Sequence, residues 1–278
     1  MNVFRLAPSL QSAVASRYNG ETLTEKRRFR NRAIVLVLIW ILLLVLSMSF
    51  LSILLSFFAH DPQGESISTE SWAGYIISRT NNPKLQVTAI NASWAVPTVN
   101  ITAGGNYSSV WIGVGGQLDM TLIQVGTEQD VFDGKGDYYA WYELLPNFAV
   151  RIDTIPVSPG DIIVASLRLV DSNASRWNIQ MSDLTTGQSF GTTVTYNSTG
   201  FSGEWILERP TVNNRLTTLA DFGNVTFTGC YLDANSNSGP MKAFYFSRIE
   251  MTNSANVPLT SISSLVDGGS GFTVSYIP

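Results

Sequence analysis

The segment from Ser108 to Leu145 reads SSVWIGVGGQLDMTLIQVGTEQDVFDGKGDYYAWYELL, and it decides the fold. It holds three of the five short apolar and aromatic runs that we expect to be strands, separated by turns rich in glycine and aspartate. These five runs are residues 85–97, 108–114, 120–125, 138–145 and 161–169. No helical apolar period is present after residue 59. We therefore expect an all-β domain of two packed antiparallel sheets, a β-sandwich of the concanavalin or jelly-roll kind.

Composition removes most of the common catalytic chemistries. The 278 residues include one cysteine, Cys230, and one histidine, His60. The chain therefore has no disulfide framework, no zinc-ligand cluster and no Ser-His or Cys-His couple, and we expect no metal and no cofactor. We expect Cys230 to be a small buried residue. Beyond residue 32 the chain has 10 basic and 19 acidic residues, a net charge of −9, which argues against a nucleic-acid partner.

Residues 33–59 form the one long apolar run and contain no charged residue. The run is longer than the ~20 residues that cross a bilayer. Basic residues precede it, whereas Asp61 and Glu65 follow it, so the positive-inside rule places the N-terminus in the cytoplasm. The alternative is a cleaved signal peptide, whose apolar part is usually shorter. We expect a single-pass protein of the cell membrane with a basic cytoplasmic tail (1–32), one transmembrane helix (33–59), a linker (60–70) and an extracellular domain (71–278).

The outward-facing domain carries six Asn-x-Ser/Thr sequons, and the tail carries none. They are Asn91, Asn100, Asn106, Asn173, Asn197 and Asn224. An exported domain can be glycosylated at such sites, and these six are our candidates. The alternative is that some sequons arise by chance, because Asn, Ser and Thr are abundant here.

Five short motifs together resemble the glutamic peptidases, or eqolisins, a family of fungal acid proteinases and prokaryotic relatives. The motifs are Trp111-Ile112-Gly113, Leu122-Ile123-Gln124-Val125-Gly126, Tyr139-Ala140-Trp141-Tyr142-Glu143, Leu184-Thr185-Thr186-Gly187-Gln188 and Glu204-Trp205-Ile206-Leu207-Glu208. They occur in the family's order between about Ser71 and Tyr276, and the chain looks like the prokaryotic type. The resemblance implies a β-sandwich and an endopeptidase that needs no cofactor and acts on protein or peptide substrates.

The resemblance also implies a catalytic dyad, Gln124 and Glu208, and a water that Glu208 activates. Strand alternation agrees, because it turns Gln124 away from Ile123 and Val125. It leaves Glu204 and Glu208 on one face, and the resemblance favours Glu208, because in the family the acid follows the short apolar stretch and precedes the next turn, here Arg209-Pro210. The residues expected to support the dyad are Trp111, Trp141, Glu143, Glu204 and Tyr139. A carboxylate base implies an acidic optimum unless burial raises its pKa.

Two departures from the fungal pattern keep other functions open. Gly115 and Tyr139 stand where the fungal members carry aspartates, and the fungal disulfides are absent. A catalytically silent sandwich that binds glycans or envelope proteins is therefore the alternative function. A structural envelope subunit that self-associates is the third.

Overall fold

The computed structural model describes residues 66–101, 106–235 and 237–278, together with residues 28, 34, 36 and 38–44 of the N-terminal part. The chain divides into two units, Met1–His60 and Asp61–Pro278. Residues 38–44 are helical. Among the residues described, no helix is both long and apolar enough to span a bilayer. Most of the expected transmembrane segment, 33–59, and of the tail, 1–32, lies outside the described residues.

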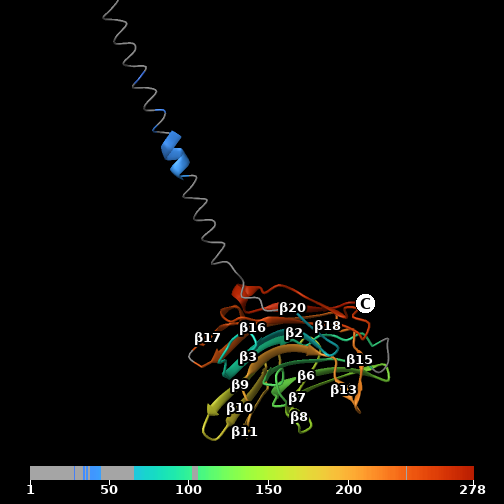
Figure 1. Ribbon diagram of the computed structural model, residues 1–278. Coiled ribbons are helices and arrows are strands. Elements are labelled where there is room, and N and C mark those ends of the chain that lie inside the picture. Colours follow the sequence, from blue (N-terminus) through green and yellow to red (C-terminus); the bar gives the residue numbers. More distant parts are fainter. Residues whose placement is uncertain are drawn as a thin grey trace, which may run out of the picture. The chain divides into compact units, whose positions relative to one another are not determined.

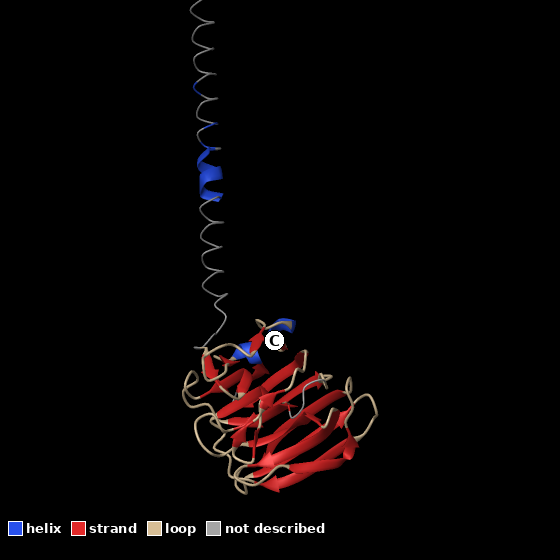
Figure 2. Cartoon of the chain, turned by 90° about the vertical axis from the view of Figure 1, so that its right-hand side faces the viewer, coloured by secondary structure: helices blue, strands red, loops and turns tan. Residues whose placement is uncertain are grey.

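The unit Asp61–Pro278 is built on a ten-stranded sheet and an eight-stranded sheet, shown in Figures 1 and 2. Neighbours in the ten-stranded sheet are β1 (Ile67–Thr69), β18 (Ser247–Met251), β2 (Trp72–Ser78), β12 (Ser202–Glu208), β5 (Ser109–Val114), β6 (Ile123–Phe132), β4 (Asn106–Tyr107) and β15 (Thr218–Leu219). From β6 this sheet also continues through β7 (Lys135–Leu144) to β8 (Val150–Pro156).

The eight-stranded sheet runs from β11 to β19. Its order is β11 (Ser189–Thr195), β10 (Arg176–Asp183), β9 (Ile162–Asp171), β3 (Val87–Ala95), β16 (Asn224–Ala234), β20 (Phe272–Tyr276) and β19 (Thr260–Ile262), with β17 (Asn237–Pro240) paired to β16. The remaining elements are the hairpin β13 (Thr211–Val212) and β14 (Arg215–Leu216) and the 3-10 turns η1 (Met241–Ala243) and η2 (Asp267–Gly269).

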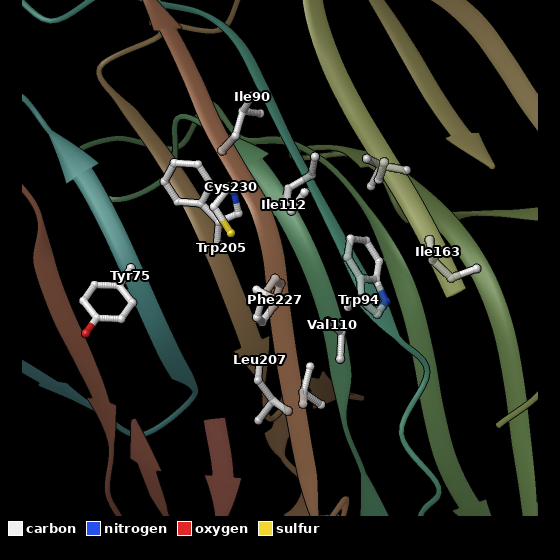
Figure 3. Close-up of a cluster of buried hydrophobic side chains, with 14 of the residues drawn as sticks. Tyr75, Ile90, Trp94, Val110, Ile112, Ile163, Trp205, Leu207, Phe227 and Cys230 are labelled. Carbon is white, nitrogen blue, oxygen red and sulfur yellow. The ribbon is translucent and has the colours of Figure 1, made fainter. Parts of the chain in front are cut away.

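The two large sheets share one apolar core, part of which Figure 3 shows. Trp205 and Ile112 come from the ten-stranded sheet, and Trp94, Phe227 and Cys230 come from the eight-stranded sheet. All five are at most 1% exposed. The Trp205 indole donates to the Asn91 carbonyl oxygen across the two sheets at 3.0 Å, so its one polar atom is paired inside the core. Burial of this apolar surface stabilises the pairing of the sheets.

The expectation of a mainly β domain with antiparallel sheets is confirmed, with three differences in detail. Two strand pairs, β1 with β18 and β4 with β15, are parallel. Strand β1 lies within the expected linker, because Ile67–Thr69 pairs with β18. Strand β6 continues to Phe132, well beyond the expected end at residue 125, because β7 pairs with it along its whole length.

Burial separates the six sequons. Asn100, Asn173, Asn197 and Asn224 are exposed, and they stay candidates. Asn106 is only 7% exposed within β4, which leaves little room for a glycan, and its glycosylation stays an untested prediction. Asn91 is half-buried and donates its amide to the Gly229 carbonyl oxygen at 2.7 Å, which a glycan would break. Cys230 is buried and unpaired, as expected, and burial raises the pKa of its thiol.

Candidate active site

Strands β12, β5, β6 and β7 lie side by side, and their register places the candidate residues in three parallel rows. The first row is Glu208, Ser109, Glu128 and Tyr139; the second is Ile206, Trp111, Gly126 and Trp141; the third is Glu204, Gly113, Gln124 and Glu143. Successive rows are two residues apart along each strand, so all three lie on one face of the sheet. The opposite face carries Ile123, Val125, Trp205 and Leu207 into the core.

A cleft of about 580 Å³ opens on this face. Its lining includes both proposed catalytic residues, Gln124 and Glu208, and the expected supporting residues Tyr139, Trp141 and Glu143. Trp72, Leu122 and the hairpin residue Val212 contribute apolar side chains to its walls. Register alone therefore brings together residues that are up to 99 positions apart in the sequence, Ser109 and Glu208.

Glu208 is half-buried at the end of β12, and one carboxylate oxygen accepts from Trp111 Nε1 at 2.7 Å. Burial raises the pKa of Glu208 to about 7; hydrogen bonds from the Trp111 and Trp72 indoles act in the opposite direction, and the negative charge of Glu143 adds to the rise. Trp111 itself is fully buried beneath the cleft and stacks edge-on against Trp72, with ring centroids 5.1 Å apart. The two indoles thus fix the position of the carboxylate.

A carboxylate on the neighbouring strand β7, that of Glu143, holds the side chain of Gln124 on β6. Its side-chain amide nitrogen donates to Glu143 Oε2 at 2.5 Å, and its amide oxygen has no hydrogen-bond partner. An ionised carboxylate can only accept, so Glu143 selects the amide nitrogen as the atom that faces it. Burial raises the pKa of Glu143, although donation from Gln124 and from the Ala149 backbone opposes the rise. Because an amide nitrogen has two N–H groups, one remains available to a ligand.

The second row separates the two proposed catalytic residues. Within the described part of the chain, no hydrogen bond joins Gln124 to Glu208, and Trp111, Gly126 and Trp141 lie between their rows. Gly126 is required there, since a Cβ at this position would lie 2.5 Å from the Val110 carbonyl oxygen and 2.6 Å from Trp111 Cβ. The Trp111 indole itself lies over Gly113, where a Cβ would come within 2.7 Å of Trp111 Cζ3, so this second glycine leaves room for the ring.

Comparison with known proteins identifies the family. A model of the Peptidase A4 family matches residues 70–276. The chain belongs to the Peptidase A4 family. It is 28% identical over 234 residues to Aspergillopepsin-2 of Aspergillus niger, covering 75% of this chain and 78% of that protein. It is 26% identical over 151 residues to Scytalidopepsin B of Scytalidium lignicola, covering about half of each.

Two solved structures of peptidases resemble the Peptidase A4 chain. A scytalido-glutamic peptidase bound to a transition-state analogue has a TM-score of 0.64 at 22% identity, covering 75% of this chain and 98% of that one. The aspergilloglutamic peptidase of Aspergillus niger has a TM-score of 0.53 at 30% identity, covering 62% and 99%. The expected resemblance to the glutamic peptidases is confirmed, and so is the prediction of an enzyme, a hydrolase of the glutamic endopeptidase class.

Glu204 occupies a different environment from the other expected Peptidase A4 site residues. It lies in the third row but is 0% exposed and is not part of the cleft lining. Burial raises its pKa well above the ordinary value; Ser202 and the Gln117 backbone oppose this, and Asp119 adds to it. Neither carboxylate oxygen meets the geometry of a hydrogen bond. Its interactions with Gln117 and Asp119 show that the 115–121 loop lies next to it, and its expected support of the dyad stays a prediction.

The same loop explains the glycine at position 115. Gly115 has a positive φ of 89°, and a Cβ there would lie 1.8 Å from the Thr121 carbonyl oxygen. An aspartate, as in the fungal members, would not fit this loop without a change in backbone. The loop has its own acid, Asp119, which accepts hydrogen bonds from Thr121 and Thr199. Burial acts to raise the pKa of Asp119, but the hydrogen bonds from Thr121 and Thr199 outweigh this effect, and the pKa is lowered.

Two acids of the cleft were not among the expected site residues. Glu128 and Asp130 are each 8% exposed, and both line the cleft beside Tyr139. Burial raises the pKa of Glu128 well above its ordinary value and that of Asp130 to about 7. In the sequence they stand in a polar run, residues 127–130, that gives no sign of burial. Among the described residues, no group of three or more His, Cys, Asp or Glu side chains could hold a metal ion.

Proposed function

We propose that this chain hydrolyses internal peptide bonds of protein substrates with Gln124 and Glu208 as its catalytic dyad. The observation that carries the proposal is that both side chains line one cleft and each is oriented by a separate partner, Glu143 for Gln124 and Trp111 for Glu208. Family membership supports the reaction class. A positioned base and a positioned amide donor are the two groups that water attack on a carbonyl requires.

In the proposed mechanism, the Glu208 carboxylate takes a proton from a water molecule, and the water oxygen attacks the scissile carbonyl carbon. The free N–H of the Gln124 amide donates to the oxygen that becomes negative in the tetrahedral intermediate. Glu208 then gives its proton to the leaving nitrogen as the C–N bond breaks. Trp111 and Trp72 favour the ionised state of Glu208 before attack, since both indoles donate to it.

The pH range follows from the pKa of the base. An acidic optimum is expected only for a carboxyl group near its ordinary pKa, and burial raises the pKa of Glu208 to about 7. Below that value the protonated form predominates, and it cannot accept a proton from water. We therefore propose that activity extends from acidic to near-neutral pH, with a rate that increases as Glu208 ionises.

We also propose that the peptidase domain is held on the outer side of the cell membrane by residues 33–59. Support comes from the uncharged 27-residue run and the basic tail before it. The described helical residues of this run, such as Trp40 at 68% exposure, present apolar side chains outward. Alkaline extraction of membranes should leave the full-length chain in the pellet, and external protease should digest the domain in intact cells. Release of the chain into the soluble fraction would contradict the anchor.

The peptidase proposal is tested by incubating an unfolded protein with the full-length chain and identifying the products by mass spectrometry. We expect internal cleavages with the wild type and none with Gln124→Ala. Glu250→Gln is the matched control, because Glu250 lies on β18 outside the cleft lining and its side chain is 37% exposed, and it should cleave at the same bonds as the wild type. Undiminished cleavage by Gln124→Ala would refute the dyad.

A further inference from the structure

Glu204 is a fully buried acid that the proposed mechanism does not use. It is 0% exposed, and neither of its carboxylate oxygens meets the geometry of a hydrogen bond. Its neighbours on the paired strands are Ile76 of β2 and Gly113 of β5, whose side chains carry no polar atom. Ser202 and the backbone of Gln117 are the donors beside it. Such surroundings suit the neutral, protonated form of a carboxyl group.

The titratable groups around Glu204 do not favour its ionisation. Burial is the main cause that raises its pKa, and the negative charge of Asp119 in the 115–121 loop adds to the rise. Tyr196, which faces Asp119, stays neutral because burial raises the pKa of its phenol. The other acids on this face of the sheet are further away, Glu208 by two rows and Glu143 by three strands.

Positive charges on the adjoining segments are engaged elsewhere. They are Arg79, which lies over the Phe201 ring at 3.6 Å, and Arg248, which pairs with Glu250 at 2.9 Å. Among the described residues, no ion pair includes Glu204 or Asp119. An ionised Glu204 would therefore be a buried charge without a counter-charge, and it could be stabilised only by water that enters when the neighbouring loop moves.

The 115–121 loop connects Glu204 to the cleft through Leu122, the residue that follows it. Leu122 lines the cleft and packs over two glycines: a Cβ at Gly113 would lie 2.8 Å from Leu122 Cδ1, and one at Gly116 would lie 3.1 Å from Leu122 Cβ. Gly113 is the register partner of both Glu204 and Gln124. The Leu122 side chain therefore occupies the space above Gly113, between the buried acid and the catalytic amide.

We infer that Glu204 is a positioning residue: its proton keeps the 115–121 loop closed, and the loop opens when that proton is lost. Opening displaces Leu122, and the Gln124 amide then loses the wall beside it. The consequence for catalysis rests on the proposed peptidase function, whereas opening of the loop does not depend on it.

The sign of the pH effect follows from linkage. The closed loop binds the proton of Glu204 more tightly than the open loop, in which water reaches the carboxyl group. The stability that this proton gives to the closed loop is fully present below the ordinary pKa of 4.5. It is lost as the pH rises through the raised pKa of the closed state.

Hydrogen exchange of the full-length chain measures opening of the loop without any need for cleavage. The protection of the amides in residues 115–121 is followed from pH 5 to pH 9 by mass spectrometry and corrected for the intrinsic exchange rate. In the wild type, the equilibrium constant for opening should increase about tenfold per pH unit until Glu204 ionises in the closed loop. In Glu204→Gln it should not change with pH, because glutamine is neutral throughout.

Two further variants make the outcome specific to Glu204. Glu250→Gln, at a side chain that is 37% exposed on β18, is the matched control and should keep the wild-type dependence on pH. Asp119→Asn removes the neighbouring negative charge, while its amide group can still bond to Thr121 and Thr199. Because this lowers the pKa of Glu204, the increase in opening should end at a lower pH than in the wild type, which decides the case if Glu204→Gln does not fold.

The same variant separates the loop from the chemistry in the pH profile of kcat/KM. Activity of the wild type should fall above the pH at which the loop opens, and activity of Glu204→Gln should not. Opening that does not depend on pH in the wild type, a wild-type dependence in Glu204→Gln, or an end point in Asp119→Asn that is unchanged or higher would overturn the inference. Opening that depends on pH as expected, in a chain that cleaves no protein, would contradict the peptidase proposal alone.

Discussion

Replacing Glu208 by glutamine should make the domain more stable at neutral pH while it removes the proposed base. Burial raises the pKa of Glu208 from an ordinary value of 4.5 to about 7. The folded chain therefore binds a proton more tightly than the unfolded chain. The stability that proton binding by Glu208 contributes is fully present below pH 4.5 and is lost as the pH rises through 7.

The size of the effect follows from the change in pKa. One pKa unit corresponds to about 1.36 kcal/mol, so ionisation of Glu208 lowers the free energy of unfolding by about 3 kcal/mol between pH 4 and pH 8. Glutamine is neutral at both pH values and has nearly the same shape, and its amide oxygen can still accept from Trp111. Glu208→Gln should therefore match the wild type at pH 4 and exceed it by about 3 kcal/mol at pH 8.

Urea denaturation at pH 4 and pH 8, followed by tryptophan fluorescence, measures the difference. The control is Glu250→Gln on β18, whose side chain is 37% exposed and paired with Arg248. This variant should stay within about 0.5 kcal/mol of the wild type at both pH values. The reasoning is refuted if the difference between Glu208→Gln and the wild type is the same at pH 4 and pH 8.

Three further predictions concern neighbouring residues. Trp111→Phe removes the indole N–H that donates to Glu208 at 2.7 Å, so the pKa of Glu208 should rise by about one to two units. The acid limb of the pH profile of kcat/KM should move up by the same amount, and a limb at the wild-type pH would show that the indole does not tune the base. Gly126→Ala should lower the free energy of unfolding by about 1–3 kcal/mol in urea, because its Cβ meets the Val110 carbonyl oxygen; unchanged stability would contradict the close packing. Ile112→Ala, in the core at 0% exposure, should lower the free energy of unfolding in urea by about 2–5 kcal/mol. Val170→Ala, at 53% exposure, should lower it by less than about 0.5 kcal/mol, and similar losses for the two variants would contradict the assigned core.

Local sequence predicted which side of the sheet each catalytic candidate occupies. Alternation along β6 was enough to separate Gln124 from the core residues Ile123 and Val125, and glycine-rich turns were enough to divide the strands. These features depend only on the two-residue period of a strand, which the sequence carries directly.

The parts that were missed depend on contacts between distant segments. Glu204 and Glu208 share one face by alternation, but the 115–121 loop encloses only Glu204, and no local pattern reports that contact. Glu128 and Asp130 were not among the predicted site residues, because the expected strand ended at residue 125. Pairing of β6 with β5 and β7 extends the strand and brings both acids into the cleft.

The most direct test of the account is the kcat/KM for cleavage of an unfolded protein, measured from pH 3 to pH 8 with the wild-type chain and with Glu208→Gln. We predict wild-type cleavage that increases with pH up to about 7 and no cleavage by the variant at any pH. Cleavage by Glu208→Gln at a rate near that of the wild type would contradict Glu208 as the base that activates water.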